Sequence, residues 1–408
     1  MKMDAAKDVA WSMADLGESP CGRFSRMVCR KEGGMGYKMD DLTSQQPHRR
    51  RQHYNGTHPH TYAEKYKELN PEQYPETVQK VIAKGSTPAG MHLPIAVEEI
   101  LSVLRIKPGE NGLDCTLGYG GHTRKLLGAL GYRPCGGRTA DGSGHLTALD
   151  IDRQNMTRTE SMLRREGYPE KALSVRYLNF AEIDRAAAEF GVFDFVLADL
   201  GVSSMQIDDP SRGFSYKREG PLDLRLDASR GVTAAERLGV LTRDEIAGML
   251  QDNADEPYAE EIAAAIAAAR KRGRKIETTT DLRELVAEAV MKAVSHQEGL
   301  KKMEREELIR SSCARTFQAI RIDINQEYES LYALLEKLPE VLNAGGRAAI
   351  LTFHSGEDRM VKKMFRQQYR DGLYEKIAED AIRPSAEECR RNPRARSAKL
   401  RWAVKASE

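Results

Sequence analysis

The sequence of 408 residues has no closely spaced cysteine pair, no long apolar run and almost no net charge. Its six cysteines are scattered without a C-x-x-C motif, which is typical of reduced thiols and argues against a disulfide framework or a metal site. No apolar stretch approaches the roughly 18 residues of a membrane span, and the N-terminus lacks the apolar segment of a signal peptide. We therefore expect a cytoplasmic protein that binds no metal and enters no membrane.

The charges of the chain nearly cancel, because 63 basic residues face 61 acidic residues and leave a net charge of +2. Nucleic-acid binding would therefore depend on local clusters of arginine and lysine, since the chain as a whole carries almost no field. Hydrophobic residues make up 40% of the sequence, which is enough for a sizeable core. At roughly 100–200 residues per domain, the length predicts two or three domains.

An N-terminal extension is predicted for residues 1–88. Residues 1–60 have little apolar periodicity, so the extension is expected to be partly flexible, and residues 48–53 form the basic cluster His-Arg-Arg-Arg-Gln-His. Two interpretations of this cluster stay open: a contact with RNA phosphates, or a solvated linker.

Apolar runs of strand length alternate with helical stretches from residue 91 onward. The runs cover residues 112–116, 146–151, 173–178, 193–200, 347–353 and 398–404. This alternation predicts an α/β fold with a mostly parallel, doubly wound sheet, whose ligands bind at the carboxyl ends of the strands.

The strand pattern disappears between residues 211 and 310, where helical signals take over. Helices are expected at residues 242–250, 258–271 and 280–296, the last with Thr280 as its N-cap. We favour a helical domain inserted into the α/β domain, because roughly 100 residues far exceed the ~2–6 residues of most connections. A helical layer packed continuously on the sheet is the alternative.

A glycine-rich turn follows the first predicted strand. It reads Asp114-Cys-Thr-Leu-Gly-Tyr-Gly-Gly-His122, and its glycines let the backbone approach a ligand closely. Asp150, at the end of the next strand, is placed to accept both hydrogen bonds of a ribose diol, whereas Asp152 is expected to cap the following helix. NAD, FAD and S-adenosylmethionine all suit such a turn, but no arrangement for a pyrophosphate is evident, so S-adenosylmethionine is favoured.

The segment from Asp199 to Asp227 fits neither a helix nor a strand repeat. It follows the apolar run Phe193-Asp-Phe-Val-Leu-Ala198, so Asp199 stands where a buried strand ends and a loop begins. In open α/β sheets this edge holds ligands, and the segment is therefore predicted to be a site loop.

Eight segments spread over the chain carry distinctive motifs. They are His92-Leu-Pro-Ile95, Asp114-x-Thr-x-Gly-x-Gly-Gly-His122, the Asp150 strand end, Asn179-Phe180, the loop from Asp199, Arg315-Thr-Phe-Gln-Ala-Ile-Arg-Ile322 with Asn325, Phe353-His-Ser-x-Glu-Asp-Arg359 and Asn392-Pro-Arg-Ala-Arg-Ser397. In this order they resemble the motifs of the RsmH (MraW) family, methyltransferases that use S-adenosylmethionine to modify the N4 amine of a cytidine in small-subunit ribosomal RNA. The resemblance covers about residue 90 to the C-terminus.

The resemblance implies a Rossmann-like class I methyltransferase. Its core would comprise residues 89–210 and 311–408, with a reversed last strand at the edge of the sheet, and residues 211–310 would form an inserted helical substrate-recognition domain. Carried over position by position, the cofactor contacts would be Gly120, Gly121, His122, Asp150, Phe180, Asp199 and Gln206. For Phe180, stacking on adenine and packing in the core are both open.

Two positions depart from the family pattern. Gly356 stands where members usually carry leucine, and Ser312-Cys313 replaces the usual His-Pro. We expect these changes to affect the fit of the substrate and to leave cofactor binding untouched.

The expected reaction needs a well-placed amine, because the exocyclic nitrogen of cytosine is a poor nucleophile. Asp199 is the candidate catalytic residue that orients the amine or accepts its proton, and a pure cofactor contact is the alternative. The base must be unstacked, so the RNA segment should be single-stranded or flexible and held by its phosphates. The loop residues predicted to contact RNA are Arg212, Lys217, Arg218, Arg225, Arg391, Arg394 and Arg396.

The expected partner is small-subunit rRNA, at its decoding region, or the assembling small subunit, and the chain would act as a monomer or homodimer. Two other functions stay open: a methyltransferase of the same fold with a different RNA target, and an assembly factor that binds rRNA without catalysis. The intact set of Gly120, Gly121 and Asp150 favours an enzyme, because a non-catalytic binder needs no cofactor cleft.

Overall fold

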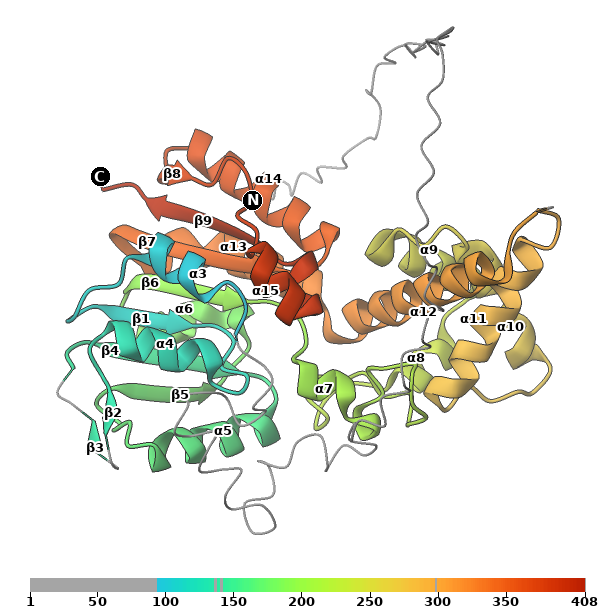
Figure 1. Cartoon of the computed structure of the whole chain (residues 1–408), viewed down its shortest axis with the longest axis horizontal. Coiled ribbons are helices and arrows are strands. Elements are labelled where there is room, and N and C mark those ends of the chain that lie inside the picture. Colours follow the sequence, from blue (N-terminus) through green and yellow to red (C-terminus); the bar gives the residue numbers. More distant parts are fainter. Residues whose placement is uncertain (1–93, 136–137, 140–141, 298, 408) are drawn as a thin grey trace, which may run out of the picture. The chain divides into compact units, whose positions relative to one another are not determined.

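The computed structural model describes residues 94–135, 138–139, 142–297 and 299–407 (Figure 1). The extension predicted for residues 1–88, with its basic cluster, lies outside these residues. No helix in the described part is long and apolar enough to cross a bilayer.

A seven-stranded sheet forms the centre of the α/β part (Figure 1). In spatial order its strands are β5 (Leu173–Tyr177), β4 (His145–Asp150), β1 (Asn111–Asp114), β6 (Phe193–Asp199), β7 (Leu342–Thr352), β9 (Lys399–Lys405) and β8 (Tyr374–Ile377). Neighbours among the first five pair in parallel, whereas β9 runs antiparallel to both β7 and β8. The predicted α/β fold with a mostly parallel, doubly wound sheet is confirmed.

The last strand of the chain runs in the reversed direction, as expected, but the prediction that it lies at the edge of the sheet is wrong. β8 pairs with the outer side of β9 and forms the edge. β8 has only four residues, and its central Glu375 and Lys376 are exposed, so its sequence reads as a loop. Short edge strands with charged side chains are a common way to protect a sheet from further pairing.

Helices cover both faces of the sheet. One face is covered by α3 (Val97–Leu104), α4 (Gly121–Ala129) and α5 (Arg153–Arg165), and the other by α6 (Ile183–Phe190), α13 (Glu327–Val341) and α14 (Ser355–Arg370). Along β6, Phe195 and Leu197 join the first hydrophobic core and Val196 and Ala198 the second, because successive side chains of a strand point to opposite faces. Burial on both faces explains why this strand reads as a continuous apolar run.

Helices between residues 234 and 325 surround a hydrophobic core of their own, to the right of the sheet in Figure 1. They are α8 (Ala234–Val240), α9 (Arg243–Ala254), α10 (Ala259–Lys271), α11 (Thr279–Ala293) and α12 (Lys302–Asn325). α12 extends past residue 310 and leads directly into α13 on the sheet. The role of this helical part as a substrate-recognition domain stays a prediction.

The N-cap of α11 is Thr278, so the prediction of Thr280 is wrong. The Thr278 hydroxyl accepts a hydrogen bond from the backbone N–H of Asp281, and the Asp281 carboxylate accepts one from the Thr278 N–H at 2.9 Å. Three consecutive threonines made the choice ambiguous, and the reciprocal pair with the carboxylate three residues on decides it.

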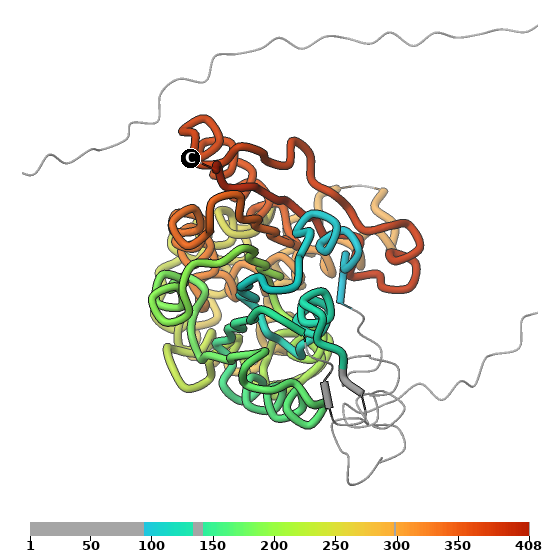
Figure 2. Tube along the Cα trace, turned by 90° about the vertical axis from the view of Figure 1, so that its left-hand side faces the viewer, coloured from blue at the N-terminus to red at the C-terminus, as the bar shows by residue number. Residues whose placement is uncertain are grey.

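The remaining elements are short and lie in connections. They are β2 (Pro134–Cys135), β3 (Arg138–Thr139), α7 (Ser204–Asp208), α15 (Ala386–Arg391) and the 3-10 helices η2 (Phe180–Glu182), η3 (Pro210–Arg212) and η4 (Pro393–Ser397). The start of the described chain lies beside its C-terminal segment: the Ala96 N–H donates to the Glu388 carboxylate at 2.9 Å, and the blue and red tubes adjoin in Figure 2.

Gly112 in β1 is expected to tolerate no larger side chain. A Cβ atom there would lie well inside van der Waals contact with the ring of Phe195 on neighbouring β6, and this ring is fully buried. Overpacking of a core costs typically about 1–3 kcal/mol. We expect Gly112→Ala to lower the free energy of unfolding by at least this amount, measured by urea denaturation.

Gly248→Ala is the matched control, because Gly248 lies inside α9 and a Cβ there meets nothing within 4 Å. Alanine favours a helix interior over glycine by about 0.5–1 kcal/mol, so this variant should be slightly more stable than the wild type. Equal stability of the two variants would contradict the steric argument.

Candidate active site

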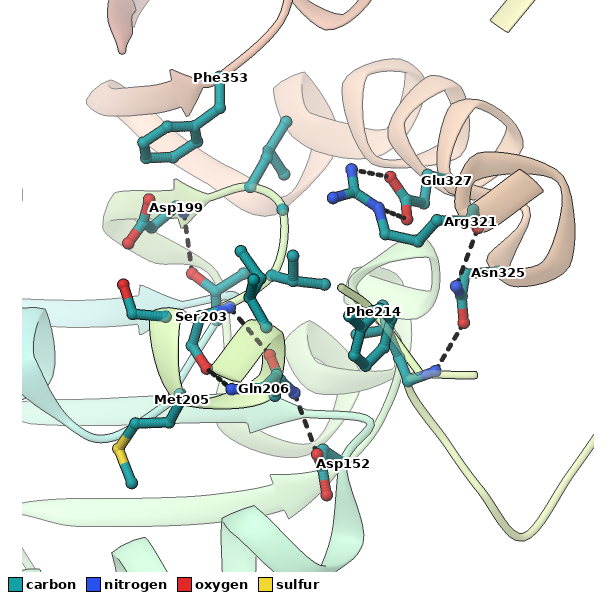
Figure 3. Close-up of a pocket in the computed structure, with 18 of the residues that line it drawn as sticks. Asp152, Asp199, Ser203, Met205, Gln206, Phe214, Arg321, Asn325, Glu327 and Phe353 are labelled. Carbon is teal, nitrogen blue, oxygen red and sulfur yellow. Dashed lines mark hydrogen bonds and ion pairs between the residues drawn. The ribbon is translucent and has the colours of Figure 1, made fainter. Parts of the chain in front are cut away.

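The main cavity lies at the carboxyl ends of β1 and β6, where the connections of the sheet turn to opposite sides. This is the position at which open α/β sheets bind ligands. The cavity has a volume of about 620 Å³, within the roughly 300–1,000 Å³ typical of ligand sites. Its walls come from the strand ends, from the loop after β6 and from the C-terminal half of α12 (Figure 3).

The glycine-rich turn after β1 forms one wall. Gly118 and Gly120 have φ angles of 49° and 74°, which lie in the left-handed region that glycine adopts easily. The carbonyl of Gly118 accepts hydrogen bonds from Asn155 Nδ2 (2.9 Å) and Thr159 Oγ1 (2.8 Å), which fix the turn. Gly121 lines the cavity at the start of α4, whereas Gly120 does not. Gly120 therefore supplies the shape of the turn.

Asp150 lies at the end of β4 and lines the cavity. Its carboxylate accepts hydrogen bonds from the backbone N–H groups of Gly118 (3.0 Å) and Asp152 (2.8 Å). Burial raises the pKa of this carboxyl group to about 7, and the nearby charge of Asp152 contributes in the same direction. The carboxylate is therefore oriented by the backbone but is costly to keep ionised.

Asp199 lies at the end of β6, and His122 in the first turn of α4 contacts it. His122 Nε2 lies 3.0 Å from the carbonyl of Ile95, to which it must donate, and His122 Nδ1 lies 3.2 Å from Asp199 Oδ2. Burial acts to lower the pKa of His122, but the charge of Asp199 and the hydrogen bonds to Asp199 and Ile95 together outweigh it, and the pKa is raised. An imidazolium that donates from both nitrogens satisfies both contacts.

The second oxygen of Asp199 has no such partner. Asp199 Oδ1 is buried and accepts no hydrogen bond from the described residues, although Asp199 lines the cavity. Buried acceptors are nearly always paired, so this atom is available to a ligand.

Gln206 and Asp152 stabilise the loop after β6 (Figure 3). Gln206 Oε1 accepts from the Ser203 N–H at 2.9 Å, and Gln206 Nε2 donates to Asp152 Oδ2 at 3.0 Å. Asp152 also accepts from the Asn155 N–H at the start of α5, which confirms the prediction that it is a helix cap. Both polar ends of Gln206 are thus occupied by the protein, and its contact with the cofactor stays a prediction.

Phe180 begins η2, lines the cavity and also packs against the hydrophobic core beneath α6 and α13. The side chain is half-buried. Stacking on adenine and core packing are both compatible with this position, so the two interpretations stay open.

The cavity suits a cationic ligand. Four of the carboxylates at or next to its wall belong to the ends of β1, β4 and β6: Asp114, Asp150, Asp152 and Asp199. His122 and Arg212 pair with only two of them. S-adenosylmethionine carries a sulfonium and an ammonium group, which fit this environment, whereas a pyrophosphate would be repelled.

The structure divides the seven basic residues predicted to contact RNA. Arg212 Nη1 pairs with Asp152 at 2.7 Å, and Arg225 donates to both carboxylate oxygens of Asp223 at 2.7 and 2.8 Å, so both stabilise the loop itself. Arg391 pairs with Glu387 on the surface, and Arg218 and Arg396 are exposed. Lys217 and Arg394 are the two that line the cavity. The RNA contacts of all seven stay predictions.

The C-terminal half of α12 provides site residues that the sequence analysis did not assign. Ala314, Phe317, Gln318, Arg321 and Asn325 line the cavity. Their spacing of three and four residues places them on one face of the helix, which groups them but does not show that this face meets a cavity. Asn325 also binds the loop, because its Oδ1 accepts from the Leu226 N–H at 2.7 Å (Figure 3) and its Nδ2 donates to the Leu224 carbonyl at 2.8 Å.

Glu327, His354 and Glu357 place potential metal ligands within 4.8 Å of one another. Arg321, however, donates to both oxygens of Glu327 at 2.8 and 2.9 Å and balances its charge. His354 is the N-cap of α14, where its Nδ1 accepts from the Glu357 N–H, and Glu357 accepts from the Phe353 N–H. This arrangement explains the group as a helix cap and an ion pair.

The two departures from the family pattern lie at contacts with the end of α9, at Asn253, and with the turn that follows it, at Glu256. A Cβ at Gly356 would collide with the hydroxyl of Tyr328, which donates to the Asn253 carbonyl at 3.2 Å. The Ser312 hydroxyl donates to the fully buried Glu256 carboxylate at 2.9 Å, beside Arg315 at 2.7 Å.

Comparison with known proteins identifies the family. The profile of the MraW methylase family matches residues 89–406. The chain is 56% identical over 364 residues to ribosomal RNA small subunit methyltransferase H 1 of Lachnoclostridium phytofermentans, which covers 89% of this chain and 95% of that protein. It is 50% identical over 365 residues to a protein of the same name from Agathobacter rectalis, covering 90% and 100%. The chain therefore belongs to the MraW methylase family, as its motifs predicted, and is an S-adenosylmethionine-dependent methyltransferase.

Proposed function

We propose that the protein transfers a methyl group from S-adenosylmethionine to the N4 amine of a cytidine in the decoding region of small-subunit rRNA, in the cytoplasm. The observation that carries the proposal is Asp199, a residue of the cavity wall whose buried Oδ1 has no hydrogen-bond partner in the described part of the chain. An amine is the kind of group that such an acceptor binds. The relatives named as small-subunit rRNA methyltransferases support rRNA as the substrate.

Asp199 would act on the amine in two ways. As a hydrogen-bond acceptor it orients the nitrogen lone pair toward the methyl group, and it takes the proton that the nitrogen loses as the new N–C bond forms. His122 holds Asp199 Oδ2 and leaves Oδ1 for the amine. A carboxylate at this position also favours cytosine over uracil, whose O4 is an acceptor and would be repelled.

The cofactor would be held by the strand ends, and when bound it supplies the methyl group. Asp150 would accept the hydrogen bonds of the ribose diol, and the backbone around Gly121 would lie against the ligand. The four acidic side chains would attract its positive charge.

The base would enter from the side of α12. Phe214, Tyr216 and Phe317 line this part of the cavity, and the rings of Tyr216 and Phe317 pack edge to face with centroids 5.8 Å apart. A cytosine taken out of its stack needs an aromatic surface, and these rings offer one. This arrangement supports substrate recognition by the helical part.

Nucleoside mass spectrometry of small-subunit rRNA tests the proposal directly. We expect N4-methylcytidine to be lost from one decoding-region position in cells without the protein, and to return when the purified enzyme and S-adenosylmethionine are added to that RNA. Unchanged rRNA would point to a different RNA target. Failure to bind S-adenosylmethionine would favour a non-catalytic assembly factor.

Asp199→Asn is expected to reduce turnover far more than cofactor binding. Loss of a positioned proton acceptor typically costs about 10²–10⁴-fold in rate, whereas asparagine keeps the size of the side chain. The measurements are kcat on small-subunit rRNA and the Kd of S-adenosylmethionine by calorimetry. Asp252→Asn, an exposed substitution on α9, is the control. A parallel loss of kcat and cofactor affinity would assign Asp199 to cofactor binding alone.

Cofactor affinity is expected to fall as the pH is lowered through 7. The pKa of Asp150 is raised to about 7, so its carboxylate is ionised above this pH and protonated below it, and only the ionised form accepts two hydroxyl hydrogens. Binding should weaken by about tenfold per pH unit below this value, measured by calorimetry between about pH 5.5 and 8.5. In Asp150→Asn the binding should be weaker throughout and lack this step. A step that persists in the variant would belong to another group.

A further inference from the structure

The cavity wall contains cations that the proposed methyl transfer leaves unused. Besides His122 and His354, the basic residues that line it are Lys217, Arg321 and Arg394. Arg321 is neutralised by its two hydrogen bonds to Glu327. Lys217 and Arg394 remain, and they come from segments far apart in the sequence.

Of the two terminal nitrogens of the Arg394 guanidinium, one faces a carboxylate and the other has no hydrogen-bond partner in the described residues. It lies in η4, where the Asn392 side chain accepts its backbone N–H at 3.2 Å and fixes the turn. Nη2 lies 3.5 Å from Asp208 Oδ1, but Nη1 is buried and has no hydrogen-bond partner among the described residues. A buried charged donor without a partner is unfavourable, so this nitrogen indicates a missing acceptor.

Lys217 lies on the loop after β6 and is exposed. Its backbone is held in place, because its own N–H donates to Ser215 Oγ at 3.3 Å and the next carbonyl, that of Arg218, accepts from Thr279 Oγ1 at 2.8 Å. No acidic side chain in the described part of the chain pairs with its ammonium group. Lys217 thus presents an uncompensated charge at the cavity from an anchored loop.

We propose that Lys217 and Arg394 each contact a backbone phosphate of the RNA next to the target nucleotide. The inference rests on the proposed function, because a base that enters the cavity brings its flanking phosphates to the mouth. A phosphate offers several acceptor oxygens, which suit both the free nitrogen of an arginine and the point charge of a lysine. Phosphate contacts fix the position of a nucleic acid without reading its sequence, so this pair positions the substrate.

The salt dependence of catalysis tests the proposal. Each phosphate contact contributes about 0.7 to the slope of log affinity against log salt for a single strand. We would measure kcat/KM for methylation of small-subunit rRNA from cells lacking the enzyme, at several KCl concentrations. This ratio is insensitive to non-productive binding. Lys217→Gln and Arg394→Gln should each reduce the slope by about 0.7, mainly through KM, and the Kd of S-adenosylmethionine should not change.

A charge-conserving variant and two distant variants distinguish the loss of a local charge from a change in structure as the cause of a lower salt slope. Arg394→Lys keeps the charge and should recover most of the salt slope. Lys271→Gln on α10 and Arg366→Gln on α14 remove exposed charges away from the cavity, so these variants should leave the salt slope unchanged. Melting temperatures check that Arg394→Gln, which also loses the ion pair with Asp208, remains folded.

Three results would overturn the inference. They are an unchanged slope in both glutamine variants, an equal loss in the distant variants, and a loss of S-adenosylmethionine affinity in Arg394→Gln, which would assign this arginine to the carboxylate of the cofactor. A wild-type enzyme that methylates no small-subunit rRNA would instead refute the proposed function and this inference with it.

Discussion

The buried negative charge at the ends of β1, β4 and β6 determines how the surrounding chain folds. An ionised carboxylate away from water is stable only when donors surround it. Each carboxylate here has a different donor: Thr123 for Asp114, backbone N–H groups for Asp150, Arg212 for Asp152 and His122 for Asp199. The left-handed glycines of the turn and the compact loop after β6 are the backbone shapes that bring these donors into place.

The loop after β6 connects the two halves of the cavity through the same interactions. Arg212 joins the loop to Asp152 and, through the carbonyls of Arg225 and Leu226, to its own far end. Asn325 at the end of α12 holds that far end from the other side. The wall assigned to the cofactor and the wall assigned to the base therefore share one loop, and a change in its fold alters both.

The sequence predicted the features that depend on residues close together in the chain. Apolar runs identified the buried strands, and glycines together with the strand-end acids Asp150 and Asp199 marked the edge that holds the cavity. Features that depend on distant partners were missed. β8 pairs along the free edge that β9 offers, and the residues around Arg212 do not show that Asp152, sixty positions earlier in the sequence, pairs with its guanidinium. The lining face of α12 follows helical spacing, but nothing in that spacing says which face meets a cavity.

The contact between Tyr328 and Gly356 limits which residues members of this family can carry at these two positions. A side chain at position 356 needs the space that the tyrosine ring and hydroxyl occupy, and a smaller residue at position 328 gives up the hydrogen bond to Asn253. The two positions are therefore coupled, and a leucine at 356 is tolerated only on a background in which 328 has already changed. Homologous chains should divide into two groups by this pair of residues, with few intermediates, because either single step passes through a collision or a void.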